Sequence, residues 1–547
     1  MTILDYFLSW EEQTPNNIFL RQPKDADWKN YSWKYCGIKA RQLLAALKAQ
    51  GFEKGDRISI LSANCAEWII CDLALMMGGY ISVPLYANIN AASMKKILKD
   101  SGCKAIITGK LNPEDWLLQK EVIGKEMKVM SMDGHDRKGC VLWSEFCQSY
   151  PIPEPIEISC EDTMTIIYTS GTTGDPKGVV HTFGSVITAV KVASDEVGLN
   201  QKGNKFVSYL PLSHAAERGL IECGGIYCGG TISFVESLES FSKNIQDTQP
   251  THFFGVPRIW EKFQIKILEK IPQNRMDILL NIPFINKILI KKIKTSLGLS
   301  NAEIILSGAA PLAPDIIRWF MKLEINIREA YGMSENFNVI SMNPAGAIKI
   351  GSVGKLFPGQ EVIIDKRTNE IKQKCSWLMK GYYRNPKQTA ETIVHDYLLT
   401  GDMGELTEDG YLKITGRVKD IFKTTKGEYI SPSLLEIPFL ELKIIEQVCI
   451  MGTFYPQPFV LISLSHLAKT LSKNEIVKSL EKVLNQQNEG VMEYQRLKKV
   501  IVSKNPWTIE NGLLTPTLKL KRSLISKKYE RKLKDIYNND ELVSWEK

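Results

Sequence analysis

The sequence lacks several features that define whole classes of protein. Its 547 residues include 11 cysteines without a single CxxC pair, and its six histidines are scattered along the chain. Neither residue type therefore has the spacing of a zinc site or a disulfide framework. An odd number of cysteines without a framework is typical of a reducing compartment, so we expect a cytoplasmic protein.

Long hydrophobic runs are also missing. The longest apolar stretch, residues 69–85, is interrupted by Asp72, two glycines and Pro84. A membrane-spanning helix needs about 20 predominantly apolar residues, so we expect no membrane span. The first residues, MTILDYFLSWEEQTP, include acids and no basic segment, which is unlike a signal peptide. We find no internal repeat and no low-complexity tract.

Neither sign of charge dominates. The chain has 69 Lys and Arg against 61 Asp and Glu, a net charge of +8, and these charges are spread along its length. A nucleic-acid-binding protein concentrates its basic residues on one element, so we expect no nucleic-acid partner. Apolar residues make up 44% of the chain, which indicates a globular protein rather than a disordered one. At about 100 to 200 residues per domain, two to four domains are expected.

Short apolar runs rich in β-branched residues alternate with amphipathic patterns over most of the chain. The alternation predicts an α/β fold with mixed, mainly parallel sheets. Strands are expected at 57–63, 104–109, 164–171, 231–237, 251–257 and 302–308, with helices at 33–50 and 315–323.

The pattern changes after Tyr411. Residues 412–432 indicate two short strands with a turn rich in Gly and Lys. A helical stretch at 433–442, a strand at 444–451 and a helix at 474–487 are expected to follow. The sequence therefore predicts a small α+β domain at residues 418–547, after a large N-terminal domain at residues 1–417.

Residues 281–299 form a separate basic, amphipathic segment. Phe284, Ile288, Ile293 and Leu297 recur at near-helical spacing, and Lys287, Lys291 and Lys294 lie on other faces. One interpretation is a surface helix with solvated lysines, which we favour. The other is an interfacial helix that collects an apolar substrate from a membrane.

The strongest local motif is YTSGTTGDPKG at residues 168–178, directly after an apolar run at 164–167. Three glycines and four hydroxyl side chains after a strand form a loop whose N–H and O–H groups can surround phosphate oxygens. Lys177 adds a positive charge. The loop is not a Walker A motif, because GxxxxGK[ST] is absent.

Six further motifs follow in order along the chain. They are LPLSH (210–214), GAAP (308–311), YGMSE (331–335), TGD (400–402), GRVKD (416–420) and TPTLKLKR (515–522). Together with the loop, this ordered series resembles the adenylate-forming (ANL) superfamily of acyl-CoA synthetases, peptide-synthetase adenylation domains and firefly luciferase. The resemblance covers nearly the whole chain. It implies a large N-terminal domain of α/β subdomains and a small, mobile C-terminal domain.

The resemblance also implies roles for the nucleotide-binding residues. The phosphate loop would include Thr169, Ser170, Gly171, Thr172, Thr173, Gly174 and Lys177. Thr169 and Glu335 would hold Mg²⁺, a cation that prefers oxygen ligands. Asp402 would accept hydrogen bonds from the ribose hydroxyls, with Arg417 beside it. The adenine ring would lie against Gly308, Ala309 and Ala310 and beside Tyr331, Gly332, Met333 and Ser334.

The catalytic assignments depend on the same resemblance. Lys519 matches the lysine that bridges the substrate carboxylate and the α-phosphate, and Lys177 joins it as a catalytic cation. His214 matches a residue on the route of the carboxylate and the thiol. Lys419 would be the hinge about which the C-terminal domain rotates between half-reactions. Gly427 would then border the passage for the pantetheine arm of coenzyme A.

Two segments indicate the branch of the superfamily. FGVPRIWEK (254–262) and NGLLTPTLKLKR (511–522) resemble long-chain fatty acyl-CoA synthetases, in which a tryptophan matching Trp260 gates the acyl tunnel. Some positions depart from the family pattern: Cys375 stands in place of a glycine, Lys426 in place of the first glycine of a pair, and Tyr397 in place of a tryptophan.

We therefore expect a long-chain fatty acid–CoA ligase that uses ATP, Mg²⁺ and coenzyme A. Attack of a carboxylate on ATP gives an acyl-AMP, from which a thiol displaces AMP. The alternatives are an acyl-AMP ligase that loads a separate acyl carrier protein, and a ligase for a medium-chain or aryl acid. A non-catalytic binder is disfavoured, because it would not need Lys519. Peripheral membrane contact and the choice between monomer and homodimer stay open.

Overall fold

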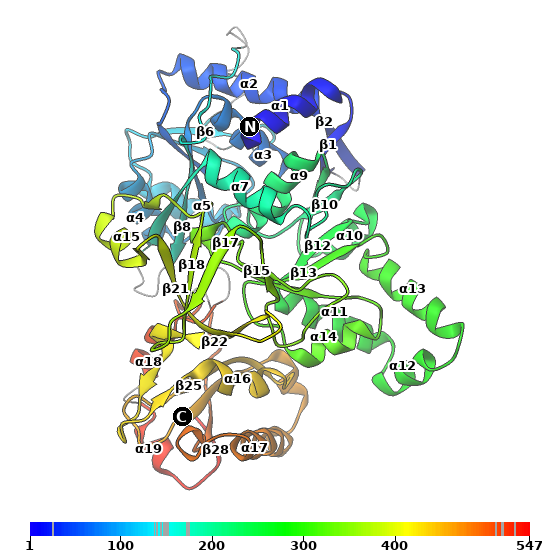
Figure 1. Cartoon of the computed structure of the whole chain (residues 1–547), viewed down its shortest axis with the longest axis vertical. Helices are drawn as coiled ribbons and strands as arrows, with labels where there is room; N and C mark the ends of the chain where they lie inside the picture. The colour runs from blue at the N-terminus through cyan, green and yellow to red at the C-terminus, as the bar shows by residue number, and fades with distance from the viewer. Residues whose placement is uncertain are drawn as a thin grey trace.

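A computed structural model gives the structure of the protein. It describes residues 1–24, 27–135, 137, 140–142, 145, 153–170, 176–508, 511–515, 519–529 and 532–546, with only the backbone of Val141 and Ser170. A large N-terminal part lies above a smaller C-terminal part in Figure 1. In the described ranges, every helix is too short or too polar to cross a bilayer.

The first sheet of the N-terminal part is mainly parallel. Among the described residues its order is β19-β9-β8-β4-β3-β5-β6-β7, with β9 antiparallel to both of its neighbours, β19 and β8. Its strands are β3 (Arg57–Leu61), β4 (Ile81–Leu85), β5 (Ala105–Thr108), β6 (Lys128–Ser131), β7 (Val141–Leu142), β8 (Thr163–Ser170), β9 (Pro176–Thr182) and β19 (Gly381–Tyr382).

The second sheet packs beside the first and is parallel in its centre. Within the described ranges its order is β16-β15-β14-β13-β12-β10-β11-β1-β2, with antiparallel strands at both edges. Its strands are β1 (Ile18–Lys24), β2 (Asp27–Ser32), β10 (Lys205–Ser208), β11 (Thr231–Phe234), β12 (His252–Gly255), β13 (Ile304–Ser307), β14 (Arg328–Tyr331), β15 (Ser341–Met342) and β16 (Lys355–Leu356).

A third, antiparallel sheet completes the N-terminal part. Its order is β17-β18-β21-β20, and β22 pairs with β21. Its strands are β17 (Gln360–Ile364), β18 (Glu370–Cys375), β20 (Ile393–Val394), β21 (Tyr397–Leu406) and β22 (Leu412–Arg417).

Helices cover these sheets, and the local sequence accounts for their ends. Asn90 and Ser32 cap α4 and α2 with side-chain oxygens, and Gly102 ends α4 in the left-handed conformation. Every residue of α3 is buried, so part of the apolar stretch 69–85 is a core helix. The helices of this part are α1 (Ile3–Gln13), α2 (Trp33–Ala49), α3 (Ala66–Met77), α4 (Ala91–Ser101), α5 (Pro113–Gln119), η1 (Lys120–Val122), α7 (Phe183–Ala193), α8 (Ala215–Glu217), η2 (Arg218–Cys223), α9 (Gly224–Cys228), α10 (Phe241–Thr248), α11 (Pro257–Lys270), α12 (Gln273–Leu280), α13 (Ile285–Leu297), α14 (Pro314–Met321), η3 (Ser334–Asn336) and α15 (Pro386–Thr392).

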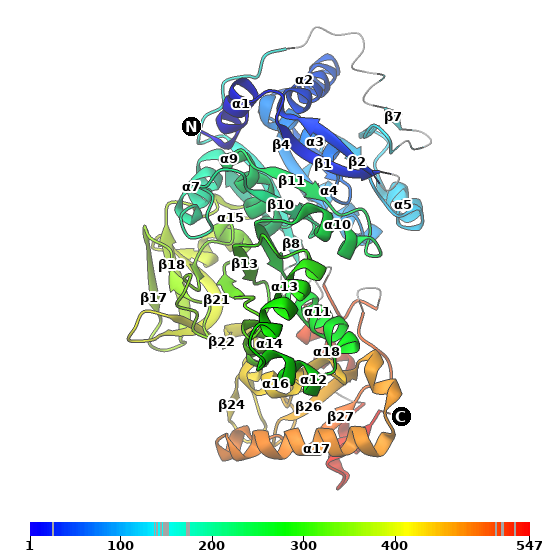
Figure 2. The same ribbon diagram turned by 90° about the vertical axis from the view of Figure 1, so that its right-hand side faces the viewer.

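The C-terminal part has its own sheet and core. In the described residues the sheet order is β25-β26-β27-β28, and a hairpin of β23 and β24 precedes it. In Figure 2, α17 lies across the end of this part that is remote from the N-terminal sheets. The elements are η4 (Val418–Asp420), β23 (Phe422–Lys423), β24 (Tyr429–Ile430), α16 (Pro432–Leu440), β25 (Ile445–Met451), β26 (Phe459–Leu464), η5 (His466–Thr470), α17 (Lys473–Glu489), η6 (Glu493–Gln495), β27 (Val500–Val502), α18 (Arg522–Tyr529), α19 (Lys534–Asn538) and β28 (Val543–Trp545).

The two parts meet through α11 and β25. The Arg258 guanidinium in α11 pairs with the Glu446 carboxylate in β25 at 2.5 Å. Helix α16 also packs against β22, the last strand of the N-terminal part. The C-terminal domain is therefore seated directly below the edge of the third sheet.

The expected α/β fold is confirmed, and each predicted strand and helix overlaps an observed one. One detail is wrong. Residues 412–432 contain three strands, and the first, β22, pairs with the preceding strand β21 rather than with β23, which pairs with β24. Its partner lies across the turn at Thr407–Tyr411, where a hydroxyl and backbone groups close the hairpin, so β22 belongs to the N-terminal part.

Candidate active site

The proposed adenine and ribose residues lie at the ends of three strands and in the middle of a fourth, β21. Gly308–Ala310 follow β13, Tyr331 ends β14, and Asp402 and Arg417 face each other across β21 and β22. The Tyr331 hydroxyl donates to Asp402 Oδ2 at 2.8 Å, and Arg417 Nε lies 2.7 Å from Asp402 Oδ1. Both oxygens of this buried carboxylate are thus held in place.

Backbone geometry explains why small residues occupy positions 309 and 332. Ala309 has a φ of 67°, in the left-handed region that few residues with a side chain adopt. A Cβ on Gly332 would lie 2.2 Å from the Asn338 carbonyl carbon, so position 332 admits only glycine without a backbone shift. The chain therefore folds back tightly behind Tyr331.

The phosphate loop is described only at its two ends. Thr169 at the end of β8 pairs with Lys177 at the start of β9. Gly171, Thr172, Thr173 and Gly174 lie outside the described residues, as does the Ser170 side chain. The Lys177 ammonium lies 5.1 Å from the centre of the Tyr382 ring. Partial burial and the nearby Lys419 charge lower the pKa of Lys177, whereas Glu335 opposes that change.

Glu335 is a buried carboxylate close enough to Lys177 to affect its pKa. It is buried, and Tyr382 donates its hydroxyl to Oε1 at 2.7 Å. In the described part of the chain, no basic side chain forms an ion pair with Glu335. A buried carboxylate held by one neutral hydroxyl, near Lys177, has the oxygen donors that suit Mg²⁺. The residues present thus fit the expected metal.

Lys519 approaches this site from the C-terminal domain. A short hairpin positions it, in which Leu514 bridges Leu520 and the Lys519 N–H donates to Thr515 Oγ1 at 3.0 Å. Its side chain keeps contact with solvent. Desolvation and the Arg417 charge lower the pKa of Lys519, while Asp402 and Glu335 raise it. Lys519 therefore lies within electrostatic reach of the ribose and metal carboxylates.

His214 lies close enough to Lys519 for the lysine charge to affect its pKa. It caps α8, and its Nδ1 accepts the Ala216 N–H at 3.2 Å. Burial, together with the Lys519 charge, lowers the pKa of His214 to about 4. His214 is therefore neutral at physiological pH, with its proton on Nε2. It can donate a hydrogen bond there but carries no positive charge.

Lys419, the hinge candidate, and Gly427, the pantetheine candidate, lie in different elements of the C-terminal part. Lys419 lies in η4, close enough to Lys177 to affect its pKa. Gly427 lies in the β23–β24 turn with a φ of 92°, and Lys423 is the neighbour that an added Cβ would approach, at 3.8 Å. Among the described residues, the structure does not bring Gly427 to Lys519. The assigned roles of both residues stay predictions.

Trp260 is fully buried beside the end of β12. Its indole N–H donates to the Gly255 carbonyl at 2.9 Å, and its ring packs edge-on against Phe253 and Phe320. A Cβ on Gly255 would lie 2.8 Å from the indole. The structure thus places Trp260 in an aromatic core cluster, and its gating role stays a prediction.

Two positioning residues were missed by sequence reasoning. Tyr382 contacts both Lys177 and Glu335, as described above. His181 in β9 lies with Nε2 2.7 Å from the Ser334 carbonyl oxygen, which holds the YGMSE segment against the first sheet. His181 follows the loop motif by three residues, but Tyr382 gives no local signal, because its partner Glu335 lies 47 residues away.

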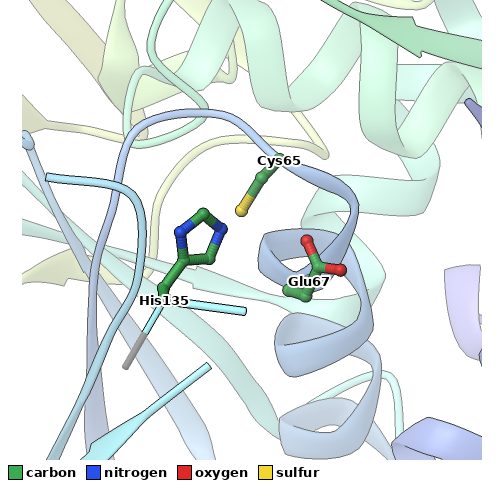
Figure 3. Close-up of side chains that lie close together, drawn as sticks. All are labelled: Cys65, Glu67 and His135. Carbon is green, nitrogen blue, oxygen red and sulfur yellow. The ribbon is translucent and has the colours of Figure 1, made fainter. Parts of the chain in front are cut away.

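A separate group of possible metal ligands lies away from these residues. Cys65 and Glu67 at the start of α3 and His135 after β6 have donor atoms within 4.8 Å of one another (Figure 3). Glu67 already accepts the Tyr31 hydroxyl at 2.8 Å, and the Lys110 charge reaches both Cys65 and His135. Sulfur and nitrogen ligands do not suit Mg²⁺, so this group is no part of the ATP site.

The described residues thus place Lys519 of the C-terminal domain within electrostatic reach of two buried carboxylates, Asp402 and Glu335. The profile of the AMP-binding enzyme family matches residues 7–383, and that of the AMP-binding enzyme C-terminal domain matches residues 419–541. The chain belongs to the AMP-binding enzyme family. It is an adenylate-forming, ATP-dependent acid–thiol ligase that releases AMP.

Curated relatives cover nearly the whole chain. The chain is 26% identical to the long-chain-fatty-acid–CoA ligase FadD15 of Mycobacterium tuberculosis, over 97% of this chain and 96% of the relative. It is 28% identical to long chain acyl-CoA synthetase 3 of Arabidopsis thaliana, over 98% and 92%. It is 25% identical to the long-chain-fatty-acid–CoA ligase ACSBG2 of Mus musculus, over 98% and 93%.

Solved structures share the fold. The anthranilate CoA ligase AuaEII in complex with anthranoyl-AMP superposes with a TM-score of 0.78 at 19% identity, covering 97% of each chain. The adenylation domain of a carboxylate reductase from Mycobacterium chelonae superposes with a TM-score of 0.80 at 21% identity, covering 98% of this chain and 91% of that one.

Proposed function

We propose that this protein is a long-chain fatty acid–CoA ligase. The observation that carries the proposal is the convergence of Lys519 from the C-terminal domain with Asp402, Arg417 and Glu335 of the N-terminal domain. A nucleotide binder needs the ribose carboxylate, but it has no use for a cation brought in from a second domain. The names of the curated relatives favour a long-chain acid.

In the first half-reaction a carboxylate oxygen attacks the α-phosphorus of ATP, and pyrophosphate leaves. Lys519 holds the carboxylate and the α-phosphate together and offsets the charge that gathers on their oxygens. Tyr331, Asp402 and Arg417 fix the nucleoside. Thr169 and Glu335 would hold Mg²⁺, which supplies positive charge to the phosphates when bound.

In the second half-reaction the sulfur of coenzyme A attacks the acyl carbon, and AMP leaves. The neutral His214 lies beside the same region, and its Nε2–H can donate to the acyl oxygen. Lys519 must move away to admit the thiol. Rotation about Lys419 would bring the β23–β24 turn with Gly427 toward this place.

The proposal also covers the location of the enzyme in the cell. A long alkyl chain gains about 0.8 kcal/mol for each CH₂ removed from water, so such acids partition into bilayers. We place the enzyme in the cytoplasm, in peripheral contact with the inner face of a membrane. Trp260 and its aromatic neighbours provide the apolar surroundings that the acid needs.

Mass spectrometry of purified protein with Mg-ATP and fatty acids from octanoate to stearate, with and without coenzyme A, tests the proposal. We expect acyl-CoA and AMP only when coenzyme A is present, with palmitate or stearate preferred. Acyl-AMP that accumulates without a thioester would favour a carrier protein as the acceptor. Activity restricted to octanoate or benzoate would favour a medium-chain or aryl acid and contradict the long-chain assignment.

A further inference from the structure

Helices α12 and α13 form a hairpin, joined by residues 281–284, that projects from the side of the N-terminal part (Figures 1 and 2). One face of the hairpin is anchored. Buried apolar side chains of both helices join the cluster around Trp260 and Phe320; they are Met276, Leu289, Ile290, Ile293 and Leu297. The base of the hairpin is therefore a fixed part of the fold.

The tip of the hairpin exposes large apolar side chains. Their exposed fractions are 63% for Ile278, 38% for Ile282, 79% for Phe284, 41% for Ile285 and 68% for Ile288. Single exposed apolar residues are ordinary on protein surfaces. Five of them within eleven consecutive residues gather at one end of the hairpin, a concentration that is typical of an interaction site.

The backbone at the tip supports the same conclusion. Phe284 precedes α13 with a φ of 68°, in the left-handed region that bulky residues avoid. Such strain persists only where the surroundings or the function require it. Burial of the phenyl ring cannot be the reason, because the ring is among the most exposed side chains of the chain.

Cations surround the apolar tip. Residues 271–299 contain Arg275, Lys287, Lys291, Lys292 and Lys294 but only one acid, Asp277. Lys287, Lys291 and Lys292 are exposed. Asp277 is occupied by Gln273, whose amide donates to it at 2.9 Å. An open hollow next to Ile288 is lined by Lys291, Lys292, Thr295, Ser296 and Gln246.

We propose that this tip, residues 278–288, docks on the surface of an anionic lipid bilayer. The apolar side chains would enter the boundary between headgroups and acyl chains, and the lysines would lie at the lipid phosphates. A second copy of the chain fits less well, because a symmetric contact would place the same lysines against each other. The biological purpose, collection of a membrane-dissolved acid, rests on the proposed function, but the docking itself does not.

Vesicle co-sedimentation of the purified full-length protein tests the docking. The probes are vesicles of phosphatidylcholine alone and of phosphatidylcholine with phosphatidylglycerol, without fatty acid or ATP. We expect binding to the mixed vesicles that falls at least about tenfold in Phe284→Ser/Ile288→Ser. Lys287→Glu/Lys291→Glu should lose a similar factor on anionic vesicles, since each surface lysine contributes to the attraction.

Matched controls come from the same chain. Lys478 and Lys482 of α17 are exposed with the same spacing of four, and Leu238 is 83% exposed outside the hairpin. Lys478→Glu/Lys482→Glu and Leu238→Ser should bind vesicles like the unmodified protein. Equal binding by the hairpin variants and these controls would overturn the proposal. So would a change of molar mass in light scattering with unchanged vesicle binding, which would indicate a second copy instead.

Acyl-AMP formation from octanoate, measured without vesicles, separates this proposal from the proposed function. The hairpin variants should keep this activity, because the tip holds none of the site residues. Vesicle binding without acid activation would contradict the proposed function alone. Acid activation with vesicle binding that is unaffected by the hairpin substitutions would contradict the docking alone.

Discussion

The two sides of the candidate active site are held in different ways. On the nucleotide side, Asp402 is fixed by Tyr331 and Arg417 through contacts of 2.8 Å and 2.7 Å. On the other side, Lys519 is positioned through its backbone, and its side chain forms no hydrogen bond or ion pair within the described part of the chain. We predict that the fixed half recognises the ribose, whereas Lys519 arrives and leaves between the half-reactions.

The largest effect on activity is expected at Lys519, on the movable side of the site. We expect Lys519→Ala to reduce acyl-AMP formation by about 10³-fold or more, because a cation aimed at the reacting oxygens is lost. Thioester formation from supplied acyl-AMP should change only a few-fold, since Lys519 withdraws before that step. Rapid-quench assays of the separate half-reactions measure both.

Lys521→Ala is the matched control, and its activity should stay near that of the unmodified enzyme. Lys521 shares the KLKR string with Lys519, but the hydrogen bonds described for it are made by its backbone, with Leu513, Leu524 and Ile525. Equal loss of both half-reactions in Lys519→Ala would contradict the movable role of this lysine.

On the nucleotide side, we expect the largest loss of activity from substitution of Asp402. Asp402→Asn keeps the shape but removes the charge that accepts from Tyr331, Arg417 and the ribose. Hydrogen bonds to charged groups contribute about 1.5–3 kcal/mol, so kcat/KM for ATP should fall on the order of 10²-fold in pyrophosphate exchange. Asp409→Asn, in a surface pair with Lys349, is the control. An unchanged KM for ATP would refute the ribose assignment.

A smaller effect is expected at Tyr382, which joins the phosphate lysine to the metal carboxylate. Tyr382→Phe removes the hydrogen bond to Glu335 and should raise the Mg²⁺ concentration for half-maximal activity about three- to tenfold. Tyr383→Phe should not, since its neighbour is the Arg384 guanidinium at 5.2 Å. Mg²⁺ titration at saturating ATP distinguishes the two, and identical midpoints would remove Tyr382 from the site.

We expect buried histidines to cost the protein stability as the pH falls below the ordinary pKa of histidine, 6.5. Burial lowers the pKa of His181, His214 and His252 from 6.5 to about 4. The unfolded chain therefore binds more protons between these values, so the free energy of unfolding falls as the pH falls from 6.5 toward 4. The loss is at most on the order of 3 kcal/mol per histidine.

Urea unfolding across this pH range measures that loss. His214→Gln should reduce the pH dependence by about a third, and His466→Gln, on an exposed residue, should leave it unchanged. Buried Glu217 and Glu329, whose pKa values are raised to about 8 and about 7, act in the opposite direction, so the test is the difference between variants. The same pH dependence in His214→Gln and in the unmodified protein would contradict a buried, neutral His214.

Local pattern predicts the elements of this fold well where a strand is an uninterrupted apolar run. Residues 164–171 and 302–308 enclose most of β8 and β13, because burial on both faces requires such runs. Strand β22 was misassigned for the opposite reason. Its partner β21 is chosen by hydrogen bonds across a hairpin, and pairing leaves little trace in the sequence of a half-buried strand.

The residues of the candidate site also divide into those that the sequence predicts and those that it does not. Asp402, Arg417 and Tyr331 could be named because each stands in a motif, and the structure brings them together. The contacts of Tyr382 with Glu335 and of His181 with Ser334 join segments far apart in the chain. Such contacts follow from packing of whole sheets, which no single segment encodes.

The tight fold behind Tyr331 also bears on how this enzyme can evolve. A Cβ at Gly332 would meet backbone at 2.2 Å and one at Gly354 would meet backbone at 1.9 Å, so substitution at either is not a route to new specificity. The aromatic wall near Trp260, by contrast, is built from side chains that can exchange shape and volume. On the proposed role of Trp260 as a gate for the acid, descendants of this chain could therefore accept new acids while the nucleotide site stays the same.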